Sequence, residues 1–119
     1  MHGPLVCAYM GDTIYERYIR EYLINKGITK VGLLQQESLN YVSAKSQRRL
    51  LEKLMNDNFF TEEELEVLKW GRNAKGTKSK STDIITYRLA TSLEALIGKL
   101  YFDNNITRID EIMKNILGD

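Results

Sequence analysis

The near absence of proline is the feature that most constrains the fold of this chain. Its 119 residues include one proline, Pro4, close to the start. Because proline lacks a backbone N–H and interrupts helices and central strands, little in this sequence breaks a regular helix. Apolar residues recur at helical spacing, and no segment alternates apolar and polar residues as a half-buried strand does. The sequence therefore predicts an all-α protein.

Apolar spacing and capping residues divide the chain into segments. The predicted helices cover residues 5–26, ended by Gly27; residues 31–36; residues 40–56; a helix opened by the capping box 61–64 (TEEE); one that begins at Thr82 or Asp83; and one that begins at Thr107. The polar stretch 71–82 contains two glycines and predicts an exposed loop or a short helical extension. With 43% hydrophobic residues, residues 1–119 are expected to form a single domain.

Charge and cysteine content narrow the possible functions. The formal net charge is +1, so a nucleic-acid partner cannot be inferred from overall balance and any basic surface must be local. Cys7 is the only cysteine, which excludes an intrachain disulfide. No apolar run approaches the roughly 18 residues of a membrane span, and the start lacks the pattern of a signal peptide. We expect a cytoplasmic protein with no membrane partner.

Two acidic residues stand among apolar neighbours: Asp12 in residues 8–16 (AYMGDTIYE) and Glu94 in residues 90–98 (ATSLEALIG). Small residues flank both acids, namely Ala8, Gly11, Ala95 and Gly98. Two helices with such small residues can approach closely, so the carboxylates could converge on one hard cation, for which Mg²⁺ is the natural candidate. A bound Mg²⁺ activates water and stabilises charge on a phosphoryl oxygen, as phosphodiester hydrolysis requires. Spacing alone favours a simpler interpretation, in which both acids are exposed or ion-paired helix residues.

The same segments resemble a known family. Residues 11–16 (GDTIYE) resemble the first half of the ribonuclease III signature, and residues 90–98 resemble its second acidic motif, in matching order and separation. The chain is more specifically similar to Mini-ribonuclease III, the bacterial form without a separate double-stranded-RNA-binding domain, in three further segments: 42–47 (VSAKSQ), 59–64 (FFTEEE) and 71–75 (GRNAK). Five matches in one order across nearly the whole chain are far more specific than any one of them.

The resemblance implies the all-helical ribonuclease III endonuclease fold, acting as a homodimer on double-stranded RNA with one site per protomer. It implies that Asp12 and Glu94 are catalytic and bind Mg²⁺. A cytoplasmic role in maturing the precursor of the large-subunit (23S) ribosomal RNA also follows from the resemblance, and ribosomal particles are a further partner that it leaves open.

Two positions depart from ordinary ribonuclease III, which carries further carboxylates where this chain has Ala8 and Thr91. In this respect the chain resembles the Mini type. Fewer charged ligands weaken the binding of a divalent ion, so RNA phosphates are expected to complete the site.

A local basic segment precedes the helix that carries Glu94: residues 69–82 hold five basic residues and no acidic one. Duplex RNA is recognised mainly through phosphates and 2′-hydroxyls, which suits such side chains. The predicted RNA-binding residues are Arg72, Asn73, Lys75, Lys78 and Lys80, with Lys45, Gln47, Arg48 and Arg49 as a second patch on the outer face of helix 40–56. The alternative is a basic surface that is merely solvated.

Residues near the first motif have open interpretations. Glu16 lies four residues after Asp12 on the same helix face, where it either orients metal-bound water or forms a structural ion pair. Four apolar or aromatic residues are candidates either for a dimer interface or for the monomer core: Tyr9, Met10, Ile14 and Tyr15.

Two other functions compete with the nuclease. Ala8 and Thr91 motivate the first, a catalytically weak or inactive helical dimer that binds structured RNA or ribosomal particles. The second is a helical protein-interaction adaptor, in which Asp12 and Glu94 are surface charges. Cleavage of duplex RNA that depends on Mg²⁺ separates the enzyme from both.

Overall fold

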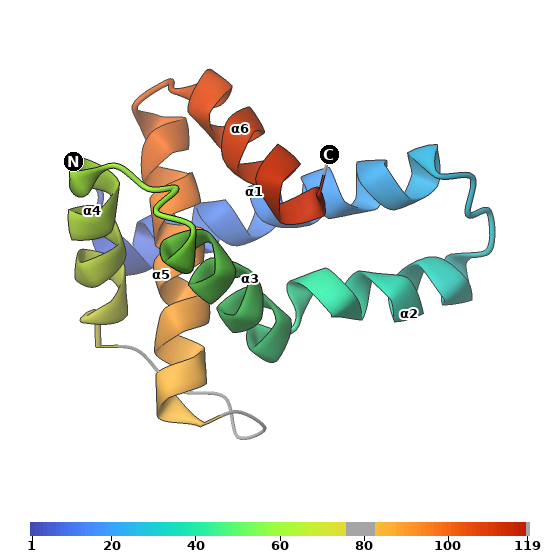
Figure 1. Ribbon diagram of the computed structural model, residues 1–119, viewed down its shortest axis with the longest axis horizontal. Helices are drawn as coiled ribbons and strands as arrows, with labels where there is room; N and C mark the ends of the chain where they lie inside the picture. The colour runs from blue at the N-terminus through green and yellow to red at the C-terminus, as the bar shows by residue number, and fades with distance from the viewer. Residues whose placement is uncertain (76–82, 119) are drawn as a thin grey trace.

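The computed structural model describes residues 1–75 and 83–118, and in these ranges it contains six α-helices and no strand (Figure 1). The helices are α1 (Pro4–Asn25), α2 (Val31–Val42), α3 (Ala44–Asn56), α4 (Glu62–Arg72), α5 (Ile84–Phe102) and α6 (Ile106–Leu117). The prediction of an all-α fold is confirmed. No helix among these residues is long and apolar enough to cross a membrane.

Helix α5 forms the centre of the molecule, and α1, α3, α4 and α6 all pack against it (Figure 1). A helix surrounded in this way must be apolar on several faces rather than along one stripe. Accordingly, Leu93, Leu96 and Ile97 of α5 are fully buried, together with Ile19 of α1 and Ile112 of α6. The helix that carries Glu94 is thus the most firmly embedded in the fold.

Two glycines determine how closely α1 and α5 approach. A Cβ atom built on Gly11 would lie 1.8 Å from the backbone carbonyl oxygen of Glu94, and one built on Gly98 would lie 1.8 Å from that of Cys7. Neither position can hold a side chain, so backbone packs directly on backbone at this crossing. The expectation that small residues bring these two helices together is confirmed.

The capping residues act largely where the sequence predicts them. Pro4 occupies the first turn of α1, where its missing N–H is not needed, and Gly27 follows the helix with a φ of +97°. Thr61 and Glu64 form the predicted capping box at the start of α4. Asp83 accepts a hydrogen bond from the backbone N–H of Thr86 and so begins α5. The last helix begins at Ile106, one residue before the predicted start.

The boundary between α2 and α3 differs from the prediction. Helix α2 continues to Val42 rather than ending near residue 36, and α3 starts at Ala44 rather than near residue 40. Ser43 separates them because its backbone is extended and its hydroxyl accepts a hydrogen bond from the backbone N–H of Ser46, as an N-cap does.

Tyr15 belongs to the protomer core and not to an exposed interface. Its side chain is fully buried, and its hydroxyl donates a 2.7 Å hydrogen bond to the carbonyl oxygen of Tyr41. Met10 and Ile14 are partly buried, whereas Tyr9 remains 82% exposed. Of the four interface candidates, only Tyr9 is a large side chain that stands fully in solvent.

Candidate active site

The close crossing of α1 and α5 brings together the two acids that the sequence singles out. Asp12 follows directly after Gly11, whose Cα faces the backbone of Glu94. The side chains of Asp12 and Glu94 are joined by a hydrogen bond. Asp12 is exposed and Glu94 is partly buried, which places this contact at the edge of the core. We call Asp12 and Glu94 the carboxylate pair.

The electrostatics of the pair are unfavourable in the absence of a cation. Burial, followed by the hydrogen bond and the negative charge of Asp12, raises the pKa of Glu94 to about 8, and the charge of Glu16 acts in the same direction. At neutral pH the pair therefore retains a proton that an ordinary glutamate would have released. A cation placed between the two carboxylates would relieve the same repulsion.

The donor set suits magnesium. Carboxylate oxygens are the ligands that Mg²⁺ prefers, and it commonly binds through one or two carboxylates, with water and substrate phosphates supplying the rest. Within residues 1–75 and 83–118 no group of three or more acidic, His or Cys side chains that could hold a metal ion is gathered. Ala8 and Thr91, which stand where ordinary ribonuclease III has further carboxylates, are both buried.

Gln47 contacts the carboxylate pair from a third helix. Its side chain is only 3% exposed, and its Nε2 donates a 3.3 Å hydrogen bond to Oε2 of Glu94. The hydrogen bond lowers the pKa of Glu94 and thus opposes the effects of burial and of Asp12. The assignment of Gln47 to the outer basic patch of α3 is wrong, because the side chain points into the protein.

The spacing of leucines in the sequence indicates that Gln47 faces the core. Leu50, Leu51 and Leu54 follow it at intervals of three, four and seven residues and are all buried, so Gln47 continues the inward face of α3.

Glu16 forms an ion pair in this structure. Its Oε2 lies 3.1 Å from Nη2 of Arg20, one turn further along α1, which matches one of its two predicted roles. Its charge nevertheless reaches Glu94, where it raises the pKa. A role in orienting metal-bound water remains a prediction.

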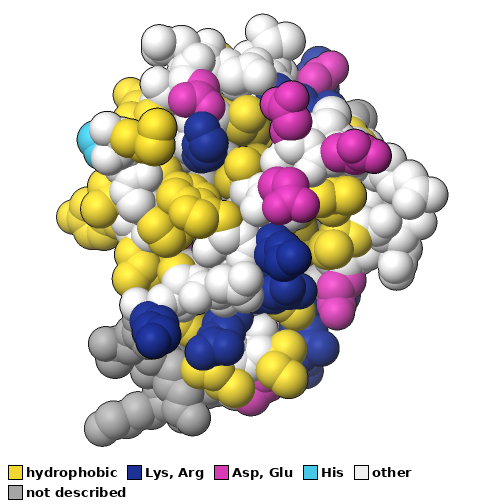
Figure 2. Space-filling view, turned by 90° about the vertical axis from the view of Figure 1, so that its left-hand side faces the viewer, with side chains coloured by type: hydrophobic (Ala, Val, Ile, Leu, Met, Phe, Trp, Pro, Cys, Tyr) yellow, Lys and Arg dark blue, Asp and Glu magenta, His cyan; other side chains and the backbone are white. Residues whose placement is uncertain are grey.

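The described members of the predicted RNA-binding set lie at or just beyond the end of α4 and on α3. Arg72, Asn73, Lys75 and Lys45 are exposed, while Lys78 and Lys80 lie outside the described residues. Figure 2 shows a face of the molecule on which Lys and Arg side chains gather in the lower half of the view. Arg72, Asn73, Lys75 and Lys45 are thus accessible to a polyanion.

Arg48 has protein partners. Its Nη1 donates to the hydroxyl of Thr86 at 2.9 Å, and its Nε lies 3.4 Å from Glu52. The Thr86 hydroxyl in turn donates to Asp83, the cap of α5. Arg48 therefore joins α3 to the start of α5, and its predicted contact with RNA remains untested.

An apolar surface lies at the start of α1. Leu5, Val6 and Tyr9 are exposed there. Cys7, on another side of the same helix turn, lines a hollow of about 730 Å³ together with Trp70 and Phe102. Hydrophobic side chains also gather on the left of the face in Figure 2. An exposed apolar surface of this kind is typical of a protein–protein contact.

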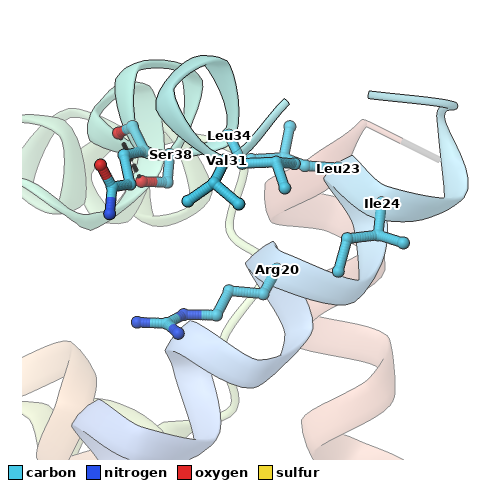
Figure 3. Close-up of a pocket in the computed structure, with 7 residues that line it drawn as sticks. Arg20, Leu23, Ile24, Val31, Leu34 and Ser38 are labelled. Carbon is cyan, nitrogen blue, oxygen red and sulfur yellow. Dashed lines mark hydrogen bonds between the residues drawn. The ribbon is translucent and has the colours of Figure 1, made fainter. Parts of the chain in front are cut away.

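A second hollow, between α1 and α2, is separate from the carboxylate pair. Its volume is about 270 Å³, and it is lined mainly by Leu23, Ile24, Val31 and Leu34 with Arg20 at its edge (Figure 3). Arg20 lies about two helical turns beyond Asp12. No predicted site residue lines this hollow.

Comparison with known proteins shows similarity over nearly the whole chain. Residues 5–105 match the family described as "Ribonuclease III domain". The chain is 46% identical to "Mini-ribonuclease 3" of Staphylococcus aureus, over 97% of this chain and 87% of that protein. It is 48% identical to "Mini-ribonuclease 3" of Brevibacillus brevis, over 94% and 83%. A crystal structure of a Fusobacterium nucleatum protein superposes with a TM-score of 0.85 at 31% identity, covering 98% of this chain and 93% of that one.

Proposed function

Because the chain belongs to the ribonuclease III family, in its Mini-ribonuclease III branch, it is an endoribonuclease, and we propose that Asp12 and Glu94 are its catalytic metal ligands. The observation that carries the proposal is the meeting of these two side chains, from helices held backbone to backbone by Gly11 and Gly98. We further propose that residues 1–119 act as one domain.

The carboxylate pair supplies negative charge at a half-buried edge, where attraction for a cation is stronger than in open water. When bound, Mg²⁺ orients and activates a water molecule and stabilises charge on a phosphoryl oxygen. Asp12 is exposed and can face a substrate, whereas Glu94 is anchored in the central helix. The pair thus combines access for RNA with a rigid support.

The enzyme acts on double-stranded RNA, and the substrate we propose in the cell is the precursor of the large-subunit (23S) ribosomal RNA. The resemblance to the Mini branch supports this substrate. The test is incubation of long duplex RNA with and without Mg²⁺, with single strands of the same sequence as the control. In competition, a precursor transcript should be cleaved before an unrelated duplex of equal length. Equal cleavage of the two would argue against the ribosomal substrate while leaving the nuclease intact.

A catalytically inactive RNA-binding dimer is the second candidate, because Ala8 and Thr91 leave the site with few carboxylates. Binding of duplex RNA without cleavage at any Mg²⁺ concentration would favour it.

We predict that the triple variant Lys75→Ala, Lys78→Ala, Lys80→Ala binds duplex RNA more weakly and with a shallower salt dependence. Each lysine that neutralises a phosphate releases counterions and contributes roughly one unit to the slope of log affinity against log salt. Titrations at several salt concentrations measure the slope. The matched control replaces Lys26, Lys30 and Lys114, which removes the same charge elsewhere. If both triple variants changed the slope equally, the basic segment would have no special role in binding.

We also propose that the enzyme is a homodimer and that the apolar surface at the start of α1 forms its interface. Sedimentation at micromolar concentration should give about twice the chain mass of 13.8 kDa. Tyr9→Asp should raise the dissociation constant about a hundredfold, because a charge would be buried at an aromatic contact. Leu39→Asp, an exposed residue of α2, is the matched control and should leave association unchanged. A parent protein that sediments as a monomer and still cuts both strands would contradict the proposal.

A further inference from the structure

We propose that Gln47 is a positioning residue of the active site, which holds the carboxylate of Glu94 in the orientation that binds the cation together with Asp12. The inference rests on the proposed function of the carboxylate pair. It adds a third helix, α3, to a site otherwise built from α1 and α5.

The helix crossing fixes the main chain at Glu94 but leaves the glutamate side chain free to rotate. Gly11 places the backbone of α1 against the backbone of Glu94, so the main chain at this point is firmly located. The glutamate side chain still has three rotatable bonds, and its carboxylate can take several orientations from one backbone position. The hydrogen bond from Gln47 Nε2 to Glu94 Oε2, at 3.3 Å, restricts that freedom. The side chain that orients the ligand therefore comes from α3.

Gln47 is a polar residue at a position where an apolar one is expected. Gln47 is 3% exposed and shares the inward face of α3 with Leu50, Leu51 and Leu54. Burying an amide costs about 1–3 kcal/mol unless it is hydrogen-bonded, and an apolar side chain of similar size would pack here without that cost. When a cation is bound, Glu94 is ionised, and a hydrogen bond from the amide to a carboxylate is stronger than one between neutral groups.

An amide suits this position better than a basic group. A lysine or arginine at this position would neutralise Glu94 and compete with the cation for the carboxylate. An amide orients one oxygen of Glu94 and leaves the charge in place. Hydrogen-bond partners of this kind fix the geometry of metal ligands, and their loss typically weakens metal binding about 10–100-fold.

The test uses Gln47→Met, which keeps the length of the side chain and removes the donor. Mn²⁺ serves as the probe of the cation site, and its binding is measured by electron paramagnetic resonance without RNA. We expect Mn²⁺ to bind about 10–100-fold more weakly. The Mg²⁺ concentration for half-maximal cleavage should rise by the same factor, while the cleavage rate at saturating Mg²⁺ stays within about threefold of the parent rate, since the ligands themselves remain. Gln47→Leu is a second variant in case the methionine protein does not fold.

The matched control is Leu50→Ala, the next inward position of α3. It loosens the packing of the same helix and should lower the melting temperature while leaving the affinity for Mn²⁺ unchanged. Folded Gln47 variants that bind Mn²⁺ as tightly as the parent would overturn the inference and leave the proposed function standing. An equal loss of affinity in Leu50→Ala would also overturn it, since general loosening would then explain the effect. If Asp12→Asn bound Mn²⁺ with the affinity of the parent, Asp12 would not be a metal ligand. Both the proposed site and this inference would then be wrong.

Discussion

Asp12→Asn and Glu94→Gln are each expected to lower the rate of duplex RNA cleavage about a thousandfold. A divalent ion contributes several kcal/mol to stabilising the transition state, and each substitution removes one of its two charged ligands. Single-turnover cleavage with excess enzyme measures this effect. Higher protein concentration or lower salt should not restore the rate, since RNA binding through the basic residues is unaffected.

The thermal stability of these two variants shows whether lost activity reflects lost metal binding or a damaged fold. The pKa of Glu94 is raised to about 8 in the folded protein, above the value for a glutamate in the unfolded chain. Glu94 therefore destabilises the folded state once the pH exceeds the unfolded pKa, and the destabilisation grows until the pH reaches about 8. Glu94→Gln removes this penalty, and Asp12→Asn removes the main neighbouring charge. Without metal at pH 7, both variants should therefore unfold at the same temperature as the parent or at a higher one. If a variant unfolded at a lower temperature than the parent, damage to the fold would explain its lost activity. If a folded variant cleaved RNA at the parent rate, the replaced residue would not be a metal ligand.

Gly11→Ala is expected to destabilise the protein by about 3 kcal/mol, which corresponds to a fall in melting temperature on the order of 10 °C. The added Cβ would lie 1.8 Å from the carbonyl oxygen of Glu94, and neither atom can move unless a whole helix moves. Cleavage should fall with stability, because the displacement separates Asp12 from Glu94. Thermal denaturation and Mn²⁺ binding by the fraction that remains folded measure the two effects.

Gly32→Ala is the matched control, since Gly32 also lies within a helix, α2, and a Cβ there would meet nothing within 4 Å. Alanine is the better helix former by up to about 1 kcal/mol, so this variant should be as stable as the parent or more stable. The same chemical change is thus predicted to have opposite signs at two positions. A Gly11→Ala protein as stable as Gly32→Ala would mean that the two helices are not in direct backbone contact.

Much of the fold could be predicted from the sequence because its helix ends are marked by local chemistry. The capping box at Thr61 and the cap at Asp83 act within four residues of chain, so no knowledge of the tertiary structure is needed to recognise them. The two acids could be singled out for a similar reason: small residues beside them predict a close helix crossing, and the structure contains that crossing.

Other features depend on contacts between distant segments, and local patterns do not determine these. Tyr15 could lie in an interface or in the core, and its hydrogen bond to Tyr41 of α2 decides for the core. The outward or inward direction of Gln47 was obscured by its basic neighbours Arg48 and Arg49, although the leucine spacing after it was visible. The break at Ser43 was missed because apolar residues continue across it at helical spacing, and one hydroxyl ends the pattern.

The backbone contact between α1 and α5 also determines when the enzyme can become active during its synthesis. Proteins are made from the N-terminus, so Asp12 is added 82 residues before Glu94. Until Gly98 has been added to the chain, α1 cannot make its close backbone contact with α5. The two carboxylates are then not yet held side by side. The carboxylate pair therefore assembles only after α5 has been made and has docked on α1.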